Sequence, residues 1–256
     1  MDPTISDISH DGELLKFTLS GINVSLANAL RRTILNDIPI LAIHTETYQD
    51  NQCTIHVNTS RLHNEILKHR LSCIPIHMVE LDILPDNYVL ELDVINDTDT
   101  MRIVTTEDFR IRNKSNDNYL TKNELNKIFP PGIKSNMFID FARLRPKIGN
   151  TIPGEKLKLT SEFSVRTAAE NNMYNVVSTC SYGNTVDLVK AKTVWDEHEN
   201  RIRAEGSTEE ELNIQKRNFY TLDAHRHFKT DSFDFAIQSV GVYENKDIVK
   251  KGCDAL

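Results

Sequence analysis

The chain has 256 residues, of which 39% are hydrophobic and 26% are charged, and this is enough to bury one large core or two smaller ones. Its formal net charge of -7 makes the surface as a whole repel phosphate, so direct DNA binding is not expected. No stretch approaches the roughly 20 consecutive apolar residues that span a bilayer, and residues 1–10 lack the basic start and apolar run of a secretory signal, so we expect an intracellular protein without membrane contact.

The first elements predicted along the chain are a strand and an amphipathic helix. Apolar and polar residues alternate from Leu14 to Leu19, which predicts a short strand ending at residues 20–21. The next segment predicts a helix that Ser25 caps and Pro39 ends. Four side chains of this helix fall within about 100° of one another on a helical wheel and form one narrow apolar stripe: Leu26, Ala27, Leu30 and Ile34.

Two arginines lie at the midpoint of this helix. On the wheel Arg31 borders the apolar stripe, whereas Arg32 points nearly opposite. An arginine beside an apolar stripe suits an interface, because its planar guanidinium can pair with a carboxylate while its stem covers apolar surface. From the residues alone, an ordinary core helix with exposed arginines remains the simpler interpretation.

The next segment predicts two strands followed by a short helix. The strands are expected at residues 40–48 and 54–57, with a turn at 50–52 between them. The helix is expected at residues 61–71 and is closed by Pro75.

A hairpin and a polar surface excursion are predicted after that helix. Residues 88–95 and 101–105 read as two strands that pair through a turn at 96–100. Residues 113–131 are polar and rich in Asn, and they contain a small helix at 123–128.

The last part of the chain predicts further strands and a helical pair. Strands are expected at residues 156–165 and 174–180. Residues 187–205 are charged and helix-prone, and Ser207 followed by Glu210 forms a capping box that starts a second helix.

The chain closes with a half-buried strand at 232–240 and a helix at 247–256. One face of that helix carries Ile248, Val249, Gly252, Cys253 and Leu256. This apolar face continues to the last residue of the chain. No repeat or linker is present, so a domain boundary must fall inside continuous globular sequence, as a nested domain would require.

The residue patterns give little support to an active site or a metal site. Neither a phosphate-binding Gly-x-x-x-x-Gly-Lys loop nor a Gly-x-Gly-x-x-Gly motif is present. Four cysteines lie far apart without a Cys-x-x-Cys pair, so reduced thiols are expected rather than a zinc ribbon or a disulfide framework. The histidines between 44 and 77 are interpreted as structural, because His63 and His69 would project from opposite sides of a helix.

Two motifs resemble a known family. Residues 24–34 read VSLANALRRTI, followed by Ile38-Pro39, and resemble the Asn-x-Leu-Arg-Arg signature that opens the dimerisation region of alpha-type RNA polymerase subunits. Residues 62–71 read LHNEILKHRL, followed by Ile-Pro, and resemble the Asp/Asn-Glu-x-x-x-His-Arg-Leu-x-x-Ile-Pro element of the archaeal and eukaryotic members. The chain is therefore identified as a member of the alpha-like assembly subunits of multisubunit DNA-dependent RNA polymerases, which include bacterial alpha, its archaeal counterpart and the third-largest subunit of RNA polymerase II.

The resemblance implies an α+β fold with nested domains. We expect a discontinuous dimerisation domain at residues 1–48 and 153–256, with a second α+β domain inserted at 49–152. Several relatives carry a zinc loop or an iron-sulfur cluster in the insert, but only Cys53 and Cys73 lie there in this chain, so neither a metal nor another cofactor is expected. The Cys-poor insert and the Asn- and Ile-rich composition fit a divergent member, such as one from a large DNA virus. The C-terminal helix is shorter than in most relatives, so either the partner interface is reduced or the chain is cut.

The resemblance also implies a function without catalysis. The expected role is a scaffold that forms a heterodimer with a smaller alpha-like subunit and nucleates assembly of the large catalytic subunits, acting in the nucleus of a eukaryote or in the cytoplasm or virion of a virus. Further expected partners are the second-largest subunit, held by the arginine pair, and small family-type assembly subunits. If about six apolar side chains are each buried at roughly 1.5 to 3 kcal/mol, the gross gain is on the order of 10 kcal/mol. The residues expected to bind partners are Leu26, Ala27, Leu30, Arg31, Arg32, Ile34, Ile248, Val249 and Leu256.

Two other functions fit parts of the sequence. A hydrolase would use the neighbourhood of Cys73 and His69, which a reactive thiol at Cys73 would support. A general protein-interaction module could use the same fold outside transcription, and polymerase large subunits would then be absent from its purified complexes.

Overall fold

The structure is a computed structural model of the whole chain. It describes residues 2–132, 135–149, 151–206 and 208–256.

The chain divides into two compact units. The first unit comprises residues 1–35, 177–239 and 245–256, and the second comprises 36–176 and 240–244. These units are defined by packing. The family-type domain boundaries expected at 48/49 and 152/153 stay a prediction.

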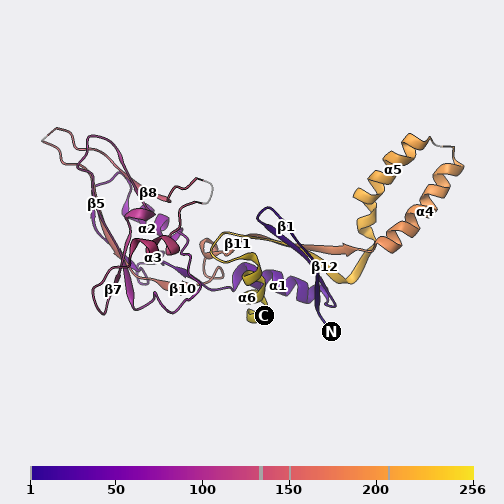
Figure 1. Cartoon of the computed structure of the whole chain (residues 1–256), viewed down its shortest axis with the longest axis horizontal. Coiled ribbons are helices and arrows are strands. Elements are labelled where there is room, and N and C mark those ends of the chain that lie inside the picture. The colour runs from indigo at the N-terminus through magenta and orange to yellow at the C-terminus, as the bar shows by residue number, and fades with distance from the viewer. Residues whose placement is uncertain (1, 133–134, 150, 207) are drawn as a thin grey trace. The chain divides into compact units, whose positions relative to one another are not determined.

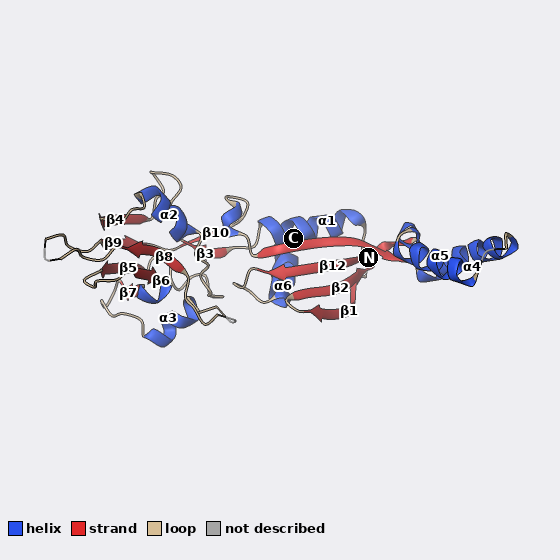
Figure 2. Ribbon diagram, turned by 90° about the horizontal axis from the view of Figure 1, so that it is seen from above, coloured by secondary structure: helices blue, strands red, loops and turns tan. Residues whose placement is uncertain are grey.

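An antiparallel sheet with strand order β1-β2-β12-β11 forms the base of the first unit (Figure 2). Alternation along two neighbouring strands sends apolar side chains to one face, where Phe17 stacks on Phe235 with ring centroids 5.3 Å apart. The opposite face carries polar side chains such as Thr18, whose hydroxyl donates to Asp234. The four strands are β1 (Thr4–Asp11), β2 (Leu14–Ser20), β11 (Val177–Val186) and β12 (Phe228–Ser239).

The edge strand β1 was not predicted from the sequence. Its side chains are exposed, so they lack the apolar alternation of a half-buried strand. The Asp11-Gly12 pair before Leu14 is the feature that could have revealed it, because this dipeptide favours a tight hairpin turn. Gly12 has a φ of 63°, a conformation that glycine adopts without strain.

Helices α1 (Val24–Asn36) and α6 (Asn245–Ala255) lie on one face of this sheet (Figure 1). The start of α1 is capped by Asn23, whose Oδ1 accepts a hydrogen bond from the backbone N–H of Leu26 at 2.9 Å. The predicted cap at Ser25 is therefore wrong, because Ser25 already lies in the first turn of the helix.

A helical hairpin joins β11 to β12 within the first unit. It consists of α4 (Leu188–Ala204) and α5 (Glu209–Thr221), which confirms the prediction of two helices around Gly206. A capping box between Thr208 and Glu211 starts α5. The predicted box began one residue earlier, at Ser207, which lies outside the described residues.

The hairpin has a small core of its own around one tryptophan. The indole N–H of Trp195 donates to Glu199 at 2.8 Å, and its ring lies 5.4 Å from that of Phe219. The buried members of this core are Ala191, Trp195, Phe219 and Ala224.

Replacing Trp195 with alanine will unfold the hairpin while the sheet stays folded. The free energy of unfolding of the hairpin is expected to fall by about 3 to 5 kcal/mol, because so small a core cannot rearrange to fill the cavity. Hydrogen exchange of the α4 and α5 amides would measure it, with Ile214→Ala as the control because that side chain is 60% exposed. Protected amides in Trp195→Ala would contradict the assignment of Trp195 to this core.

In its described residues, the second unit contains three small antiparallel sheets and two helices. Its main sheet has strand order β4-β9-β5-β7, and the other two pair β3 with β10 and β6 with β8. The strands are β3 (Ile40–Ala42), β4 (Cys53–Asn58), β5 (Tyr88–Ile95), β6 (Arg102–Thr105), β7 (Arg110–Asn113), β8 (Asp140–Leu144), β9 (Lys156–Ser161) and β10 (Ser164–Arg166). The helices are α2 (Asn64–Ser72) and α3 (Lys122–Ile128), and both were predicted. Short 3-10 turns lie at Thr106–Asp108, Asn172–Tyr174 and, in the first unit, Asp223–Arg226.

The pairing predicted between residues 88–95 and 101–105 is wrong. Strand β5 pairs with β7 and β9, whereas β6 pairs with β8. The cause lies in the buried side chain of Asn96, whose Nδ2 donates to the carbonyls of Thr100 and Leu144. These bonds tie the turn to β8 and direct the next strand onto it.

The strand predicted at residues 40–48 is shorter than expected. After Ala42 the backbone N–H of His44 bonds to the Gln52 side chain at 3.0 Å, and the His44 ring meets the Tyr174 hydroxyl at 3.1 Å. The backbone N–H of Gln52 also donates to the His44 carbonyl at 2.9 Å, but no strand continues there, and β3 pairs with β10. The mixture of helices and antiparallel sheets confirms the predicted α+β class. Among the described residues, no helix is long and apolar enough to cross a membrane.

Candidate partner-binding site

Helix α6 crosses α1 at a glycine. A Cβ placed on Gly252 would lie 2.5 Å from Cγ1 of Ile34 and 3.5 Å from Cδ1 of Leu30. Because carbon atoms do not approach to 2.5 Å without displacement, only a residue without a side chain allows the two helices to come this close.

The residues predicted to bind partners have divided roles in the structure. Four of them are buried by the chain itself, with exposed fractions from 0% to 4%: Ala27, Leu30, Ile34 and Ile248. Their burial stabilises the fold of the first unit. These four side chains leave little surface for another chain, and their contact with a partner stays a prediction.

The remaining apolar side chains, which lie on the two helices or directly after α6, keep exposed surface. Leu26 is 38% exposed and Leu256 is 57% exposed, and Val249 is partly buried. Val24 at the start of α1 and Cys253 in α6 are also exposed, although neither was among the predicted site residues. We refer to these five residues as the helix-pair flank. Partner contact by any of them stays a prediction.

The two arginines of α1 differ in their surroundings. Arg31 is half-buried, and its guanidinium donates two hydrogen bonds to Oδ1 of Asn28, at 3.2 and 3.0 Å. Arg32 is exposed. Within the described part of the chain, no carboxylate lies at ion-pair distance from either arginine, so both charges remain available to another molecule.

The thiol under α1 is not a reactive group. Burial raises the pKa of Cys180 to about 11, and the nearby charge of Arg31 opposes that shift. Cys53 is similar, since burial raises its pKa to about 11 as well. Thiols with such pKa values carry almost no thiolate at neutral pH.

The pair considered for hydrolase chemistry lacks the required activation. Cys73 is joined to His69 by a backbone bond, in which its N–H donates to the His69 carbonyl at 3.2 Å. Partial burial raises the pKa of the Cys73 thiol, although the charge of Arg70 opposes the shift. An activated nucleophile needs a lowered pKa, whereas the pKa of this thiol is raised, so these two residues give the hydrolase hypothesis no support. No group of His, Cys, Asp or Glu within the described ranges is arranged to hold a metal ion.

Alkylation will distinguish these thiols. Because its pKa is raised, Cys73 should react with iodoacetamide more slowly than free cysteine at neutral pH, and its rate should rise only at higher pH. The buried Cys53 and Cys180 should stay unmodified in the folded protein. Mass spectrometry of the peptides measures all of these rates, and a Cys73 that reacts faster than free cysteine would restore the hydrolase hypothesis.

Two packed helices on one face of an antiparallel sheet, with apolar side chains left along their flank, define an α+β protein of the helix-covered sheet type. The chain belongs to the RNA polymerase Rpb3/Rpb11 dimerisation domain family, whose sequence profile matches residues 16–256. The predicted family is thereby confirmed. The expectation of a viral source stays a prediction.

Three relatives show how far this similarity extends. The DNA-directed RNA polymerase subunit Rpo3 of Pyrococcus furiosus is 40% identical over 85 residues, which cover 31% of this chain and 30% of that protein. The DNA-directed RNA polymerases I and III subunit RPAC1 of Homo sapiens is 39% identical over 72 residues, covering 28% and 19%. The conjugation stage-specific protein of Tetrahymena thermophila is 33% identical over 102 residues, covering 40% and 29%. The matched stretches thus span at most about three-tenths of these relatives.

Proposed function

We propose that this chain is a non-catalytic subunit of a DNA-directed RNA polymerase. It pairs with a smaller alpha-like subunit, and the heterodimer nucleates assembly of the large catalytic subunits and of small assembly subunits. Its cellular location is that of the polymerase, in the nucleus of a eukaryote or in the cytoplasm or virion of a virus. The match of a dimerisation-domain profile to residues 16–256 carries this proposal.

The helix-pair flank is the surface proposed to meet the alpha-like partner. Leu26 on α1, Val249 on α6 and Leu256 just after α6 offer apolar area beside a rigid crossing, so they need little ordering on binding. The buried stripe residues support this surface from below by fixing the two helices relative to each other.

Burial of the helix-pair flank alone gains too little free energy to hold the partner. Fully burying an exposed Leu or Val gains roughly 1.5 to 3 kcal/mol, and these side chains are already partly covered. Association costs an estimated 4 to 15 kcal/mol or so in lost freedom, so the partner must contribute further contacts around the flank. We propose that the discontinuous domain of residues 1–48 and 153–256 supplies them, with residues 49–152 as the insert.

The arginine pair is proposed to hold the second-largest subunit. A guanidinium matches a carboxylate in a two-point geometry, and neither arginine is neutralised by the described part of this chain. Arg31 is pre-oriented by Asn28, which lowers the ordering cost of such a bond.

Replacing Arg31 and Arg32 together with alanine should leave the fold intact and weaken recovery of the second-largest subunit about tenfold or more, since a hydrogen bond to a charged group contributes roughly 1.5 to 3 kcal/mol. A pull-down against co-expressed polymerase subunits measures it. The matched control replaces Arg201 and Arg217, two exposed arginines of the hairpin, with alanine. Equal recovery from both double variants would remove the role from the α1 pair.

Co-expression with the smaller alpha-like subunit of the same source tests the proposed function directly. Native mass spectrometry should detect a complex with one copy of each chain. A chain that stays monomeric beside that subunit, and that recovers no polymerase subunit from its native source, would contradict the proposal.

A further inference from the structure

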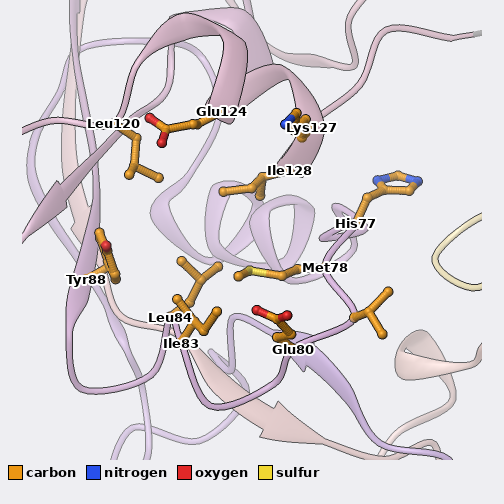
Figure 3. A pocket seen from close by; sticks show the side chains of 11 residues that line it. His77, Met78, Glu80, Ile83, Leu84, Tyr88, Leu120, Glu124, Lys127 and Ile128 are labelled. Atoms are coloured by element: carbon orange, nitrogen blue, oxygen red, sulfur yellow. The ribbon is translucent and has the colours of Figure 1, made fainter.

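A surface pocket of about 430 Å³ lies in the second unit, between α3 and the segment 77–88 (Figure 3). Its floor is apolar, since Leu84 and Ile128 are almost fully buried and Met78 lies beside Leu84 in the view. Tyr88 and Leu120 close one end. The mouth is open to solvent, and the exposed side chains of Val79 and Ile83 lie at it.

The rim of this pocket is acidic. Glu80 lies on one side of the apolar floor and Glu124 lies on the α3 side, where hydrogen bonds from Thr121 lower the pKa of the Glu124 carboxyl. Asp82 and Asp86 do not line the pocket, but they add two exposed carboxylates on the same segment as Glu80. None of these four acids forms an ion pair with a described residue.

Among the described residues that line the pocket, the buried and unpartnered Nδ1 atom of His77 is not directed at the apolar floor. The ring of His77 points away from the floor in Figure 3, and its Nδ1 atom is shielded from solvent. Small-molecule sites combine an enclosed apolar cavity with a few placed polar groups inside it. Here the charged side chains, Lys127 included, lie at the rim.

We infer that this pocket binds a large apolar side chain of a partner protein, in a segment where lysines or arginines flank that side chain. An apolar anchor that fills a pocket is a common form of interaction hot spot, and the rim of an interface is commonly polar. The acids at the rim and on the segment beside it outnumber Lys127, so they attract a cationic segment and disfavour an acidic one. The site lies in the second unit, so it does not depend on the helix-pair flank or on the proposed dimer.

Three labelled peptides test the inference on the full chain. They share a central phenylalanine and differ only in their flanking residues, which are lysines, serines or glutamates. Fluorescence anisotropy should show that the lysine peptide binds at least about tenfold more tightly than the serine peptide, that the glutamate peptide does not bind, and that added salt weakens binding.

Substitutions at the pocket distinguish the contribution of charge to peptide binding from that of apolar contact. Replacing Glu80 and Asp82 with lysine should reverse the order of the three peptides. Replacing Ile83 with serine should weaken binding of all peptides that bind, because it removes apolar surface at the mouth. The matched control replaces Asp97 and Asp99 with lysine, since these exposed acids lie away from the pocket and give the same change in net charge.

Circular dichroism confirms that each variant is folded, so a change in peptide affinity reports on the pocket and not on unfolding. A reversed order in the rim variant, an unchanged order in the control and a loss in Ile83→Ser would support the inference. Binding that ignores the flanking residues, or that the rim variant and the control change equally, would overturn it. So would the absence of binding by any peptide to the folded wild-type chain.

Discussion

Replacing Gly252 with leucine is expected to destabilise the first unit by about 1 to 3 kcal/mol. The new side chain would start 2.5 Å from Cγ1 of Ile34, which is fully buried and cannot move aside without displacing its own neighbours. Leucine gains about 1 kcal/mol over glycine in helix propensity, but the overpacking outweighs that gain. Urea unfolding followed by circular dichroism measures the net effect.

Gly183 provides the matched control. It lies in strand β11, and a Cβ placed there would meet nothing within 4 Å. Gly183→Leu should therefore leave stability unchanged or raise it slightly, since glycine in a strand interior is unfavourable. If both leucine variants unfolded at the same urea concentration, the close crossing of α6 over α1 would not be a determinant of stability.

The helices were the part of the fold most accessible to sequence analysis. The periodicity of α1 and α6 and the charged hairpin of α4 and α5 are local features, and each was predicted close to its observed bounds. Strand pairing was harder, because β5 pairs with β9 across a sequence separation that no local pattern encodes. Strand β8 was missed for the same reason, since its partner β6 reads locally as part of a hairpin.

The candidate partner-binding site shows a second limit of prediction from hydrophobic periodicity. An apolar stripe on α1 indicates that one face is buried, but it does not say which chain covers it. In the structure Leu30 and Ile34 are covered by Gly252 and its surroundings, so much of the expected association energy belongs to folding. The acidic pocket was also beyond prediction, because segment 77–88 and helix α3 meet only through tertiary packing.

Replacing Leu30 with aspartate will unfold the first unit rather than only block a partner. Leu30 is 4% exposed, so the change removes a buried side chain, at about 2 to 5 kcal/mol, and also buries a charge without a counter-ion. That total is comparable with the whole stability of a typical domain. Thermal unfolding followed by circular dichroism should show loss of the transition of the first unit.

Replacing Leu26 with aspartate should leave the first unit folded but weaken the heterodimer. This side chain is 38% exposed and lies in the first turn of α1, where a negative charge gains about 0.3 to 1 kcal/mol from the helix dipole. Folding should therefore change little, whereas a charge placed in the proposed interface should weaken the heterodimer by at least about tenfold, as judged by size-exclusion chromatography with the alpha-like subunit. Ser25→Asp adds the same charge one residue earlier, on the polar side of the helix, and should affect neither property.

The two leucines together separate folding from association. If Leu30→Asp kept the wild-type unfolding transition, the stripe would not belong to the core of this chain, and a partner would have to cover it. If Leu26→Asp bound the alpha-like subunit as Ser25→Asp does, the helix-pair flank would not be the contact surface. We expect Leu30→Asp to fail to fold and Leu26→Asp to fold but fail to pair. This result requires that adjacent faces of α1 serve the folding of the first unit and the contact with the partner.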